Sequence, residues 1–318
     1  MAQLPRVSPV KKESASPEVR AVLDDIQNTM GVPWPPANWR SHAMYPGAMR
    51  LFWERLKPAV ATQQFLLDSL QITEWAYGDV GKWYRPGHSP SVPESQRQRI
   101  EWELDAFQFG NPQLLIQQIA LDRMLRGEMV GRDEECQPRQ QRSAYRQPEI
   151  KMVTEREATP QIKRLYGDIK QTLNLPVMNS DYQAMAKWPD FFWPGWDDLK
   201  QWRAREEYQH LWLEIAHMGE EAVNRLCYSL SLDQNEVRRA VGDPGEYENL
   251  RRMVDMFVHL LPGLIANDTL LRYGIAAGRT VVPPRPEGEP SPGAAGASRL
   301  RTPHQRHQGA VAQNHHPL

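Results

Sequence analysis

Apolar residues recur every three or four positions in several parts of this sequence, which is the spacing of one buried face of an α-helix. The first such stretch covers residues 17–30. Its apolar positions are Val19, Val22, Leu23, Ile26 and Met30. Ser16 is a favourable helix cap, Pro17 fits the first helical position, and Gly31 stops the pattern. The sequence therefore predicts an amphipathic helix over residues 17–30.

A second helix of the same design is predicted 143 positions further along the chain. Thr159 and Pro160 repeat the cap and the first position, and Asn174 stands where the first helix stops. Its apolar positions are Ile162, Leu165, Tyr166, Ile169 and Leu173. Aligned without a gap, residues 16–57 and 159–200 are identical at 10 of 42 positions. This agreement indicates an internal repeat.

The repeat continues, more weakly, into the helical stretches downstream. Residues 105–115 and 255–265 match at a separation of 150 positions through Asp, Phe, Pro and Leu. A period of about 145 residues is typical of a duplicated domain, because solenoid units have only about 20 to 50 residues. No stretch alternates polar and apolar residues convincingly, as a strand would. The expected fold is all-α: an internally duplicated helical domain whose halves pack as a pseudo-dimer around a cleft.

Changes in composition divide the chain into segments. The stretch after residue 135 is polar and lacks helical periodicity, and the stretch from Val282 onward is rich in Pro, Gly and His with few large apolar residues. The predicted organisation is a flexible N-terminus at 1–15, helical repeat one at 16–135, a linker at 136–155, helical repeat two at 156–281 and a disordered Pro/Gly/His-rich tail at 282–318.

Composition narrows the class of partner and the compartment. Lys and Arg number 38 against 39 Asp and Glu, for a net charge of -1, which argues against nucleic acid or a membrane as the main partner. Cys136 and Cys227 form no metal-type or redox spacing, so both are expected to be free thiols in a reducing compartment. The start of the chain has no apolar core of the signal-peptide type. We expect a soluble, cytoplasmic protein with a small-molecule partner.

The two copies differ in polarity at two informative positions. Asp181 of copy two corresponds to Asn38 of copy one, and Asn111 of copy one corresponds to Leu261 of copy two. Core positions stay apolar in both copies, so a polar group present in only one copy points to a site that both halves build together. Asn111 also stands directly before Pro112, where it is a favourable helix cap.

Capping is the alternative interpretation of the acidic position as well. Ser180 or Asp181 suits the start of a helix at Tyr182. Capping and binding are compatible, because two helix N-termini that point into one cleft present free N–H groups and positive dipole ends to a small anion. The sequence predicts that the helix starts at Pro112 and Tyr182 are arranged in this way.

Three segments resemble one known family. They are VPW at residues 32–34, FQFGNPQLL at 107–115 and SDYQAMAKWP at 180–189. With the duplication, these segments resemble the group I (DL-type, inverting) 2-haloacid dehalogenases. The resemblance runs over most of residues 15–278. The resemblance implies hydrolysis of 2-halocarboxylic acids to 2-hydroxy acids by direct water attack at C2 with inversion, without an ester intermediate, metal or organic cofactor.

The resemblance also implies roles for particular residues. Asp181 would be the general base and Asn111 would hold the attacking water. The expected substrate-binding residues are Trp34, Ala37, Leu114, Ser180 and Tyr182. Ala37 stands where the family has an aromatic residue, and Leu114 where it has a tyrosine. The alternative is therefore a relative that binds small carboxylic acids without turning them over or with a different specificity. A homodimer is compatible with either.

Other clusters of residues suggest competing functions. Glu207, His210, Glu214 and His217 share one helix face and are capable of binding a metal. A carboxylate-bridged metal site needs a matching set of ligands on other helices, and the sequence offers none, so a solvated face is preferred. The eleven tryptophans invite a stacking surface for nucleic acid, but the near-neutral charge argues against it. Trp53 and Trp196 occupy matching repeat positions, which favours core packing.

Overall fold

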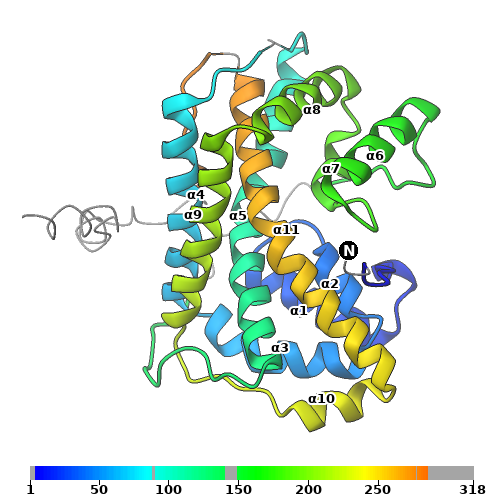
Figure 1. The fold of residues 1–318 in the computed structure, drawn as a ribbon, viewed down its shortest axis with the longest axis vertical. Coiled ribbons are helices and arrows are strands. Elements are labelled where there is room, and N and C mark those ends of the chain that lie inside the picture. Colours follow the sequence, from blue (N-terminus) through cyan, green and yellow to red (C-terminus); the bar gives the residue numbers. More distant parts are fainter. Residues whose placement is uncertain (1–3, 88–89, 140–148, 277, 286–318) are drawn as a thin grey trace, which may run out of the picture.

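The computed structural model describes residues 4–87, 90–139, 149–276 and 278–285, and this part of the chain is helical without strands (Figure 1). The helices are α1 (Pro17–Met30), α2 (Ala37–His42), α3 (Pro46–Val60), α4 (Gln63–Trp83), α5 (Glu94–Leu125), α6 (Pro160–Leu173), α7 (Ser180–Met185), α8 (Pro189–Arg203), α9 (Glu206–Asn224), α10 (Gln234–Val241) and α11 (Pro244–Ala276), with a short 3₁₀ turn at Lys12–Ser14. The all-α prediction is confirmed.

The two longest helices, α5 and α11, form the centre of the molecule. They make more contacts with each other than any other pair, and α4 and α9 pack beside them. Helices α1, α2, α3 and α10 lie at one end of this group, whereas α6, α7 and α8 lie toward the other (Figure 1). The two short helices, α2 and α7, therefore approach the central pair from opposite halves of the sequence.

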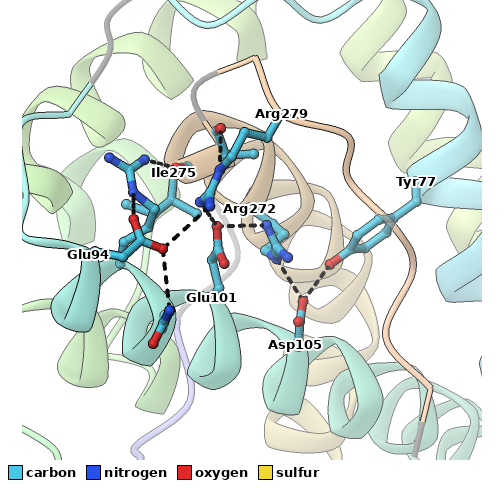
Figure 2. A network of polar contacts seen from close by, with 10 residues as sticks. Tyr77, Glu94, Glu101, Asp105, Arg272, Ile275 and Arg279 are labelled. Carbon is cyan, nitrogen blue, oxygen red and sulfur yellow. Dashed lines mark hydrogen bonds and ion pairs between the residues drawn. The ribbon is translucent and has the colours of Figure 1, made fainter.

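A network of charged side chains fixes α5 against α11 in antiparallel orientation (Figure 2). The Arg272 Nε atom donates to Asp105 Oδ1 at 2.8 Å, and Arg279 Nη2 lies 2.5 Å from Glu101 Oε1. Tyr77 on α4 donates to the same Asp105 carboxylate at 3.5 Å. Burial raises the pKa of Asp105, and the Arg272 guanidinium opposes that shift. These contacts join the start of α5 to the end of α11.

Both predicted caps are confirmed at the starts of α1 and α6. The backbone N–H of the third helical residue donates to Ser16 Oγ in α1 and to Thr159 Oγ1 in α6, in each case at 3.3 Å. Both helices end at a residue in the left-handed region, Gly31 with φ 72° and Asn174 with φ 52°. The same local chemistry therefore starts and ends the two helices.

The prediction that Asn111 caps a helix at Pro112 is wrong. Both residues lie inside α5, which continues unbroken from Glu94 to Leu125. A proline within a helix leaves the carbonyl four residues earlier without its intrahelical donor. In this protein the hydroxyl of Thr73, on α4, donates to the freed Gln108 carbonyl at 2.8 Å. A residue 35 positions away thus supplies the hydrogen bond that the proline removes.

Contacts inside the two halves also correspond. The Trp53 indole N–H donates to Asp25 at 2.7 Å, and that of Trp196 donates to Asp168 at 2.6 Å. Both tryptophans are buried, as the core interpretation requires. The members of each pair are 28 positions apart, and the pairs are related by the repeat distance. The duplication stays a prediction, and these matched contacts support it.

The prediction of free thiols is wrong, because Cys136 and Cys227 form a disulfide with their Cα atoms 5.9 Å apart. The segment after α5 folds back on the segment after α9, where Val130 pairs with Leu230 and Arg132 with Cys227. The bridge connects residues separated by 91 positions. Cytoplasmic location was inferred partly from free thiols and stays a prediction.

The N-terminal segment contacts the start of α11. Arg6 of the N-terminal segment contacts Glu246 at 2.6 Å. Most of the predicted tail and part of the predicted linker, residues 286–318 and 140–148, lie outside the described residues. Helix α11 has the length and hydropathy of a membrane span, but 72% of that stretch is buried, as in a core helix of a soluble protein.

Candidate active site

The short helices α2 and α7 bring corresponding residues to one place beside α5 and α11. Asn38 is the second residue of α2, and Asp181 is the second residue of α7. Helix α7 begins at Ser180, so the prediction of a helix starting at Tyr182 with a capping Ser180 or Asp181 is wrong. The two polar side chains that distinguish the copies in this segment face a common cavity.

The cavity is small and largely apolar. Its lining residues are Trp34, Ala37, Asn38, Asn111, Leu114, Asn179, Ser180, Asp181, Phe257, Leu260, Leu261 and Leu264. Its volume is about 30 Å³, which suffices for a water molecule. The walls come from both halves of the chain, so the predicted cleft between halves corresponds to this cavity. The structure brings together all of the predicted site residues except Tyr182.

Asn111 and Asp181 are in direct contact. Asn111 Nδ2 donates to Asp181 Oδ1 at 2.7 Å, and both side chains are buried. The partners are 70 positions apart in the sequence. The antiparallel helices α5 and α11 and the short helix α7 therefore hold a carboxamide against a carboxylate, with space for a water nearby.

A second carboxyl group completes this cluster, and the sequence analysis missed it. Asp268, on α11, accepts from the same Asn111 Nδ2 atom at 3.0 Å. Burial first, and then the Asp181 charge, raise the pKa of Asp268 well above its usual range. Burial also raises the pKa of Asp181, while hydrogen bonds from Asp268 and Asn111 lower it. Two buried carboxyls that accept from one amide nitrogen disfavour a second negative charge.

Three polar atoms around the cavity are buried and have no hydrogen-bond partner in the described structure. They are Asn38 Nδ2, Asn179 Nδ2 and Ser180 Oγ. Buried polar groups are normally paired, so unpaired donors beside a cavity indicate where a polar ligand binds. Each of these atoms is able to donate to an anionic oxygen or a halide.

The apolar wall of the cavity depends on a glycine. Trp34 is buried and its ring lies 4.4 Å from that of Phe107. A Cβ atom on Gly110 would lie 2.7 Å from Trp34 Cη2, so only glycine allows this approach of α5. Ala37 and Leu114, the two departures from the family, both line the cavity.

Tyr182 is not among the residues that line the cavity, and its part in substrate binding stays a prediction. Its ring stacks on Phe192 at 5.8 Å, and its hydroxyl accepts from Asn267 Nδ2 at 2.7 Å. Tyr208 donates to the same Asn267 side chain at 2.6 Å. Through these contacts, the buried Tyr182 side chain anchors α7 to the core.

The competing metal cluster is not assembled. No group of three or more His, Cys, Asp or Glu side chains in the described residues is arranged to hold a metal ion. His210 instead packs its ring against Trp75 at 6.3 Å. Five of the tryptophans are buried and form no stacking surface: Trp34, Trp39, Trp53, Trp196 and Trp202.

A larger cavity of about 960 Å³ adjoins the small one. Leu260 and Leu264 line both of them, and Arg203, Arg252 and His259 lie on the walls of the larger cavity. The two leucines therefore separate the buried carboxylate cluster from a cavity that carries cationic side chains.

Comparisons with known proteins agree with this geometry. A family described as "Halocarboxylic acid dehydrogenase DehI" matches residues 33–182. An (R)-2-haloacid dehalogenase from Pseudomonas putida is 29% identical over 287 residues, which cover 84% of this chain and 94% of the relative. A configuration-inverting 2-haloacid dehalogenase from Alcaligenes xylosoxydans xylosoxydans is 24% identical over 258 residues, which cover 76% and 84%.

A solved structure extends the agreement to the whole helical body. The D-2-haloacid dehalogenase in its complex with L-LA has a TM-score of 0.80 and 26% identity, over 85% of this chain and 97% of that one. The family match covers Trp34, Asn111 and Asp181, and the structural match covers both halves. The chain therefore resembles the 2-haloacid dehalogenases over most of its length, and the relatives that it matches are named as dehalogenases of 2-haloacids.

Proposed function

We propose that this protein hydrolyses 2-halocarboxylic acids to 2-hydroxy acids by direct attack of water at C2, with inversion. Asp181 is the general base, and Asn111 holds the water. The observation that carries the proposal is the 2.7 Å hydrogen bond between these two buried residues, beside a cavity with room for a water. The names of the relatives support the substrate class and the inversion.

The chemistry follows from the groups present. The water oxygen forms a bond to C2 on the side opposite the halogen, the carbon–halogen bond breaks, and its electron pair leaves with the halide. One water proton passes to Asp181, whose buried carboxylate is a stronger base than an exposed one because burial raises its pKa. Asn111 uses its N–H groups on the carboxyls, so its carbonyl oxygen is left to accept a hydrogen bond from the second O–H of the water, which stays on the product as the 2-hydroxyl group.

The remaining donors hold the charged ends of the substrate. Ser180 Oγ and the side-chain amides of Asn179 and Asn38 are the unpaired buried groups at the cavity. They receive the substrate carboxylate and the departing halide, together with the indole N–H of Trp34. The leucines of α11 surround the carbon chain and exclude bulk water, which strengthens these interactions.

The competing function is binding of small carboxylic acids without turnover. It is motivated by Ala37 and Leu114, which line the cavity where the family has larger aromatic side chains. Halide release separates the two functions, so each enantiomer of 2-chloropropanoate and 2-bromopropanoate is incubated with wild-type protein. Release above the buffer rate is expected, and binding without release from any of them would establish the competing function.

Asp181→Asn then tests the base. The variant keeps the shape of the side chain, so the helical circular dichroism should be unchanged while turnover falls at least about 100-fold. Asn38→Asp in the same background should not restore it, because Asn111 donates to the side chains at positions 181 and 268. A single turnover with excess enzyme in ¹⁸O-water should place the label in the product hydroxyl. An unlabelled product with ¹⁸O on Asp181 would reveal an ester intermediate instead.

A further inference from the structure

Asp268 lies behind the cavity, and the reaction described above gives it no part. It is fully buried on α11 and does not line the cavity. Within the described residues it reaches the reacting groups through the cluster, where Asn111 Nδ2 is 3.0 Å from Asp268 Oδ2 and 2.7 Å from Asp181 Oδ1. A carboxyl group in this position acts on the reaction through Asn111 and Asp181 rather than on the substrate.

The two carboxyls determine which way the Asn111 carboxamide faces. An amide nitrogen has two hydrogens, and each of them is taken here by one carboxyl oxygen. A flipped amide would place its oxygen against the ionised Asp181 carboxylate and would take the amide donor away from Asp268 Oδ2, which is unfavourable. With Asp268 in place, the Asn111 oxygen is left free to accept from a water. Without Asp268, one amide hydrogen loses its acceptor and the orientation is less strongly determined.

The surroundings of Asp268 favour its protonated form. The titratable groups that act on it or feel its charge are Asp181, Tyr182 and Tyr208, and none of them is a cation. Arg203 donates to the Tyr208 hydroxyl at 2.9 Å and its charge acts on Tyr182, so this cation acts on the neighbours of Asp268. Asp268 Oδ1 is buried without a partner in the described structure, which strongly disfavours a full charge. A bound proton removes that penalty.

The other half of the chain provides an internal comparison. At the repeat distance of 150 positions, Gln118 corresponds to Asp268. Gln118 Oε1 contacts His42 Nε2 at 3.0 Å, so copy one places a neutral hydrogen-bonding side chain at this position. The preceding residues also correspond, since Gln117 contacts Trp39 at 2.9 Å and Asn267 contacts the matching Tyr182.

We propose that Asp268 is a positioning residue that stays protonated during the reaction, fixes the Asn111 carboxamide with its oxygen toward the water, and keeps Asp181 as the ionised member of the pair. The kinetic part of this inference rests on the proposed function. The protonation state of Asp268 is independent of it, because it depends only on the buried surroundings.

Two variants test the proposal by halide release across pH. Asp268→Asn keeps one acceptor and one donor without a charge, so kcat should stay within about tenfold of wild type and the acid limb of kcat/KM should not move. Asp268→Leu removes both groups. Its kcat should fall at least about 100-fold with little change in KM, and the acid limb should move to higher pH because Asp181 loses a hydrogen-bond donor.

Other outcomes would overturn the proposal. Wild-type kinetics in a folded Asp268→Leu would remove any positioning role. An equal loss in both variants would mean that the charge of Asp268, rather than a neutral hydrogen-bonding group, is required. Glu103→Gln is the matched control, because Glu103 is a buried carboxyl outside the cluster that pairs with Lys187 at 2.5 Å. It should lower the thermal midpoint without moving the pH profile.

A measurement without substrate keeps the inference testable if no haloacid is turned over or Asp268→Leu fails to fold. In the unfolded chain an aspartate ionises near pH 4, whereas Asp268 keeps its proton in the folded protein, so wild type loses stability as the pH rises above about 4. Asparagine does not titrate. The thermal midpoint of Asp268→Asn relative to wild type should therefore increase from pH 4 to pH 7, and a constant difference would contradict a protonated Asp268.

Discussion

Asn111 Nδ2 lies 2.7 Å from Asp181 Oδ1, and the two residues belong to helices of very different size. Asn111 is near the middle of α5, which has 32 residues and is buried along most of its length, whereas Asp181 is on α7, which has six. The contact forms only when the two halves of the chain are packed together. The proposed base and the group that orients its water therefore depend on tertiary structure rather than on local sequence.

Asn111→Leu should lower kcat at least about 100-fold, because it removes the acceptor for the water and the donor to Asp181. Leucine is the residue at the corresponding position 261 and is close to asparagine in size. Loss of the donor should also raise the pKa of Asp181 further, which moves the acid limb of kcat/KM to higher pH. Steady-state halide release across pH measures both effects.

Gln113→Leu is the matched control for that substitution. Gln113 lies on the same helix, is buried, and donates to the Phe109 carbonyl at 2.9 Å, but it does not line the cavity. Its loss should reduce stability while leaving the pH profile in place. A profile that shifts equally in both variants would assign the effect to damage along α5 and not to the Asn111 amide.

His42→Met should remove part of the acid sensitivity of the fold. Burial lowers the pKa of His42 to about 4, so the unfolded chain takes up its proton near pH 6.5 while the folded protein does not. The unfolded state binds more protons in this window, and stability is lost as pH falls from about 6.5 toward 4. The shift corresponds to about 3 kcal/mol.

Methionine is the residue at the corresponding position 185 and is also buried. Urea unfolding at pH 7 and at pH 4.5 should therefore give a smaller loss of stability for His42→Met than for wild type. Equal losses in the two proteins would mean that His42 is already protonated in the folded state near pH 4.5 or that it is not isolated from solvent.

Arg272→Leu should lower the free energy of unfolding by about 3 kcal/mol, because it leaves the carboxylates of Asp105 and Glu101 partly buried without this partner (Figure 2). Arg279→Leu is the comparison. Arg279 contacts Glu101 too, but half of its side chain is exposed. Its loss should therefore lower the free energy of unfolding by less than about 1 kcal/mol. Chemical denaturation distinguishes the two, and similar values for both variants would refute the ranking.

Reduction of the Cys136–Cys227 bridge should destabilise the protein without stopping turnover. The bridge closes a long loop of 91 positions between the two halves, for which the chain-entropy relation gives on the order of 5 kcal/mol. Neither cysteine lines the cavity. Melting with and without reductant, alongside a Cys136→Ser/Cys227→Ser variant that should not respond to reductant, measures the effect. Thiol titration of freshly isolated protein also reports on the predicted cytoplasmic location.

Local chemistry made much of the fold predictable. Capping at Ser16 and Thr159, with Gly31 and Asn174 at the opposite ends, requires only neighbouring residues, and both helices formed as expected. The comparison of the two copies selected Asn111 because the corresponding residue, Leu261, is apolar, and Asp181 because the corresponding residue, Asn38, carries no charge. The structure then placed these side chains in contact.

The predictions that failed depend on residues far away in the sequence. A helix continues through Pro112 because Thr73 supplies a donor from another helix, and the cysteines meet because two connecting segments pair. Asp268 was missed because its partner Asn111 is 157 positions away. One sequence signal was available, since Asp268 is a lone carboxylate within a long apolar stretch and corresponds to the polar Gln118 in the other copy.

The cavity beside Asp181 is smaller than the proposed substrate. A volume of about 30 Å³ holds a water but not a haloacid, so α7 or the leucines of α11 must move before substrate is admitted. Any displacement of α7 away from α5 also lengthens the Asn111–Asp181 hydrogen bond. If the substrate enters by a displacement of α7, the same movement would break this hydrogen bond, and the open form would be inactive. Closure of α7 over the bound substrate would form the hydrogen bond again.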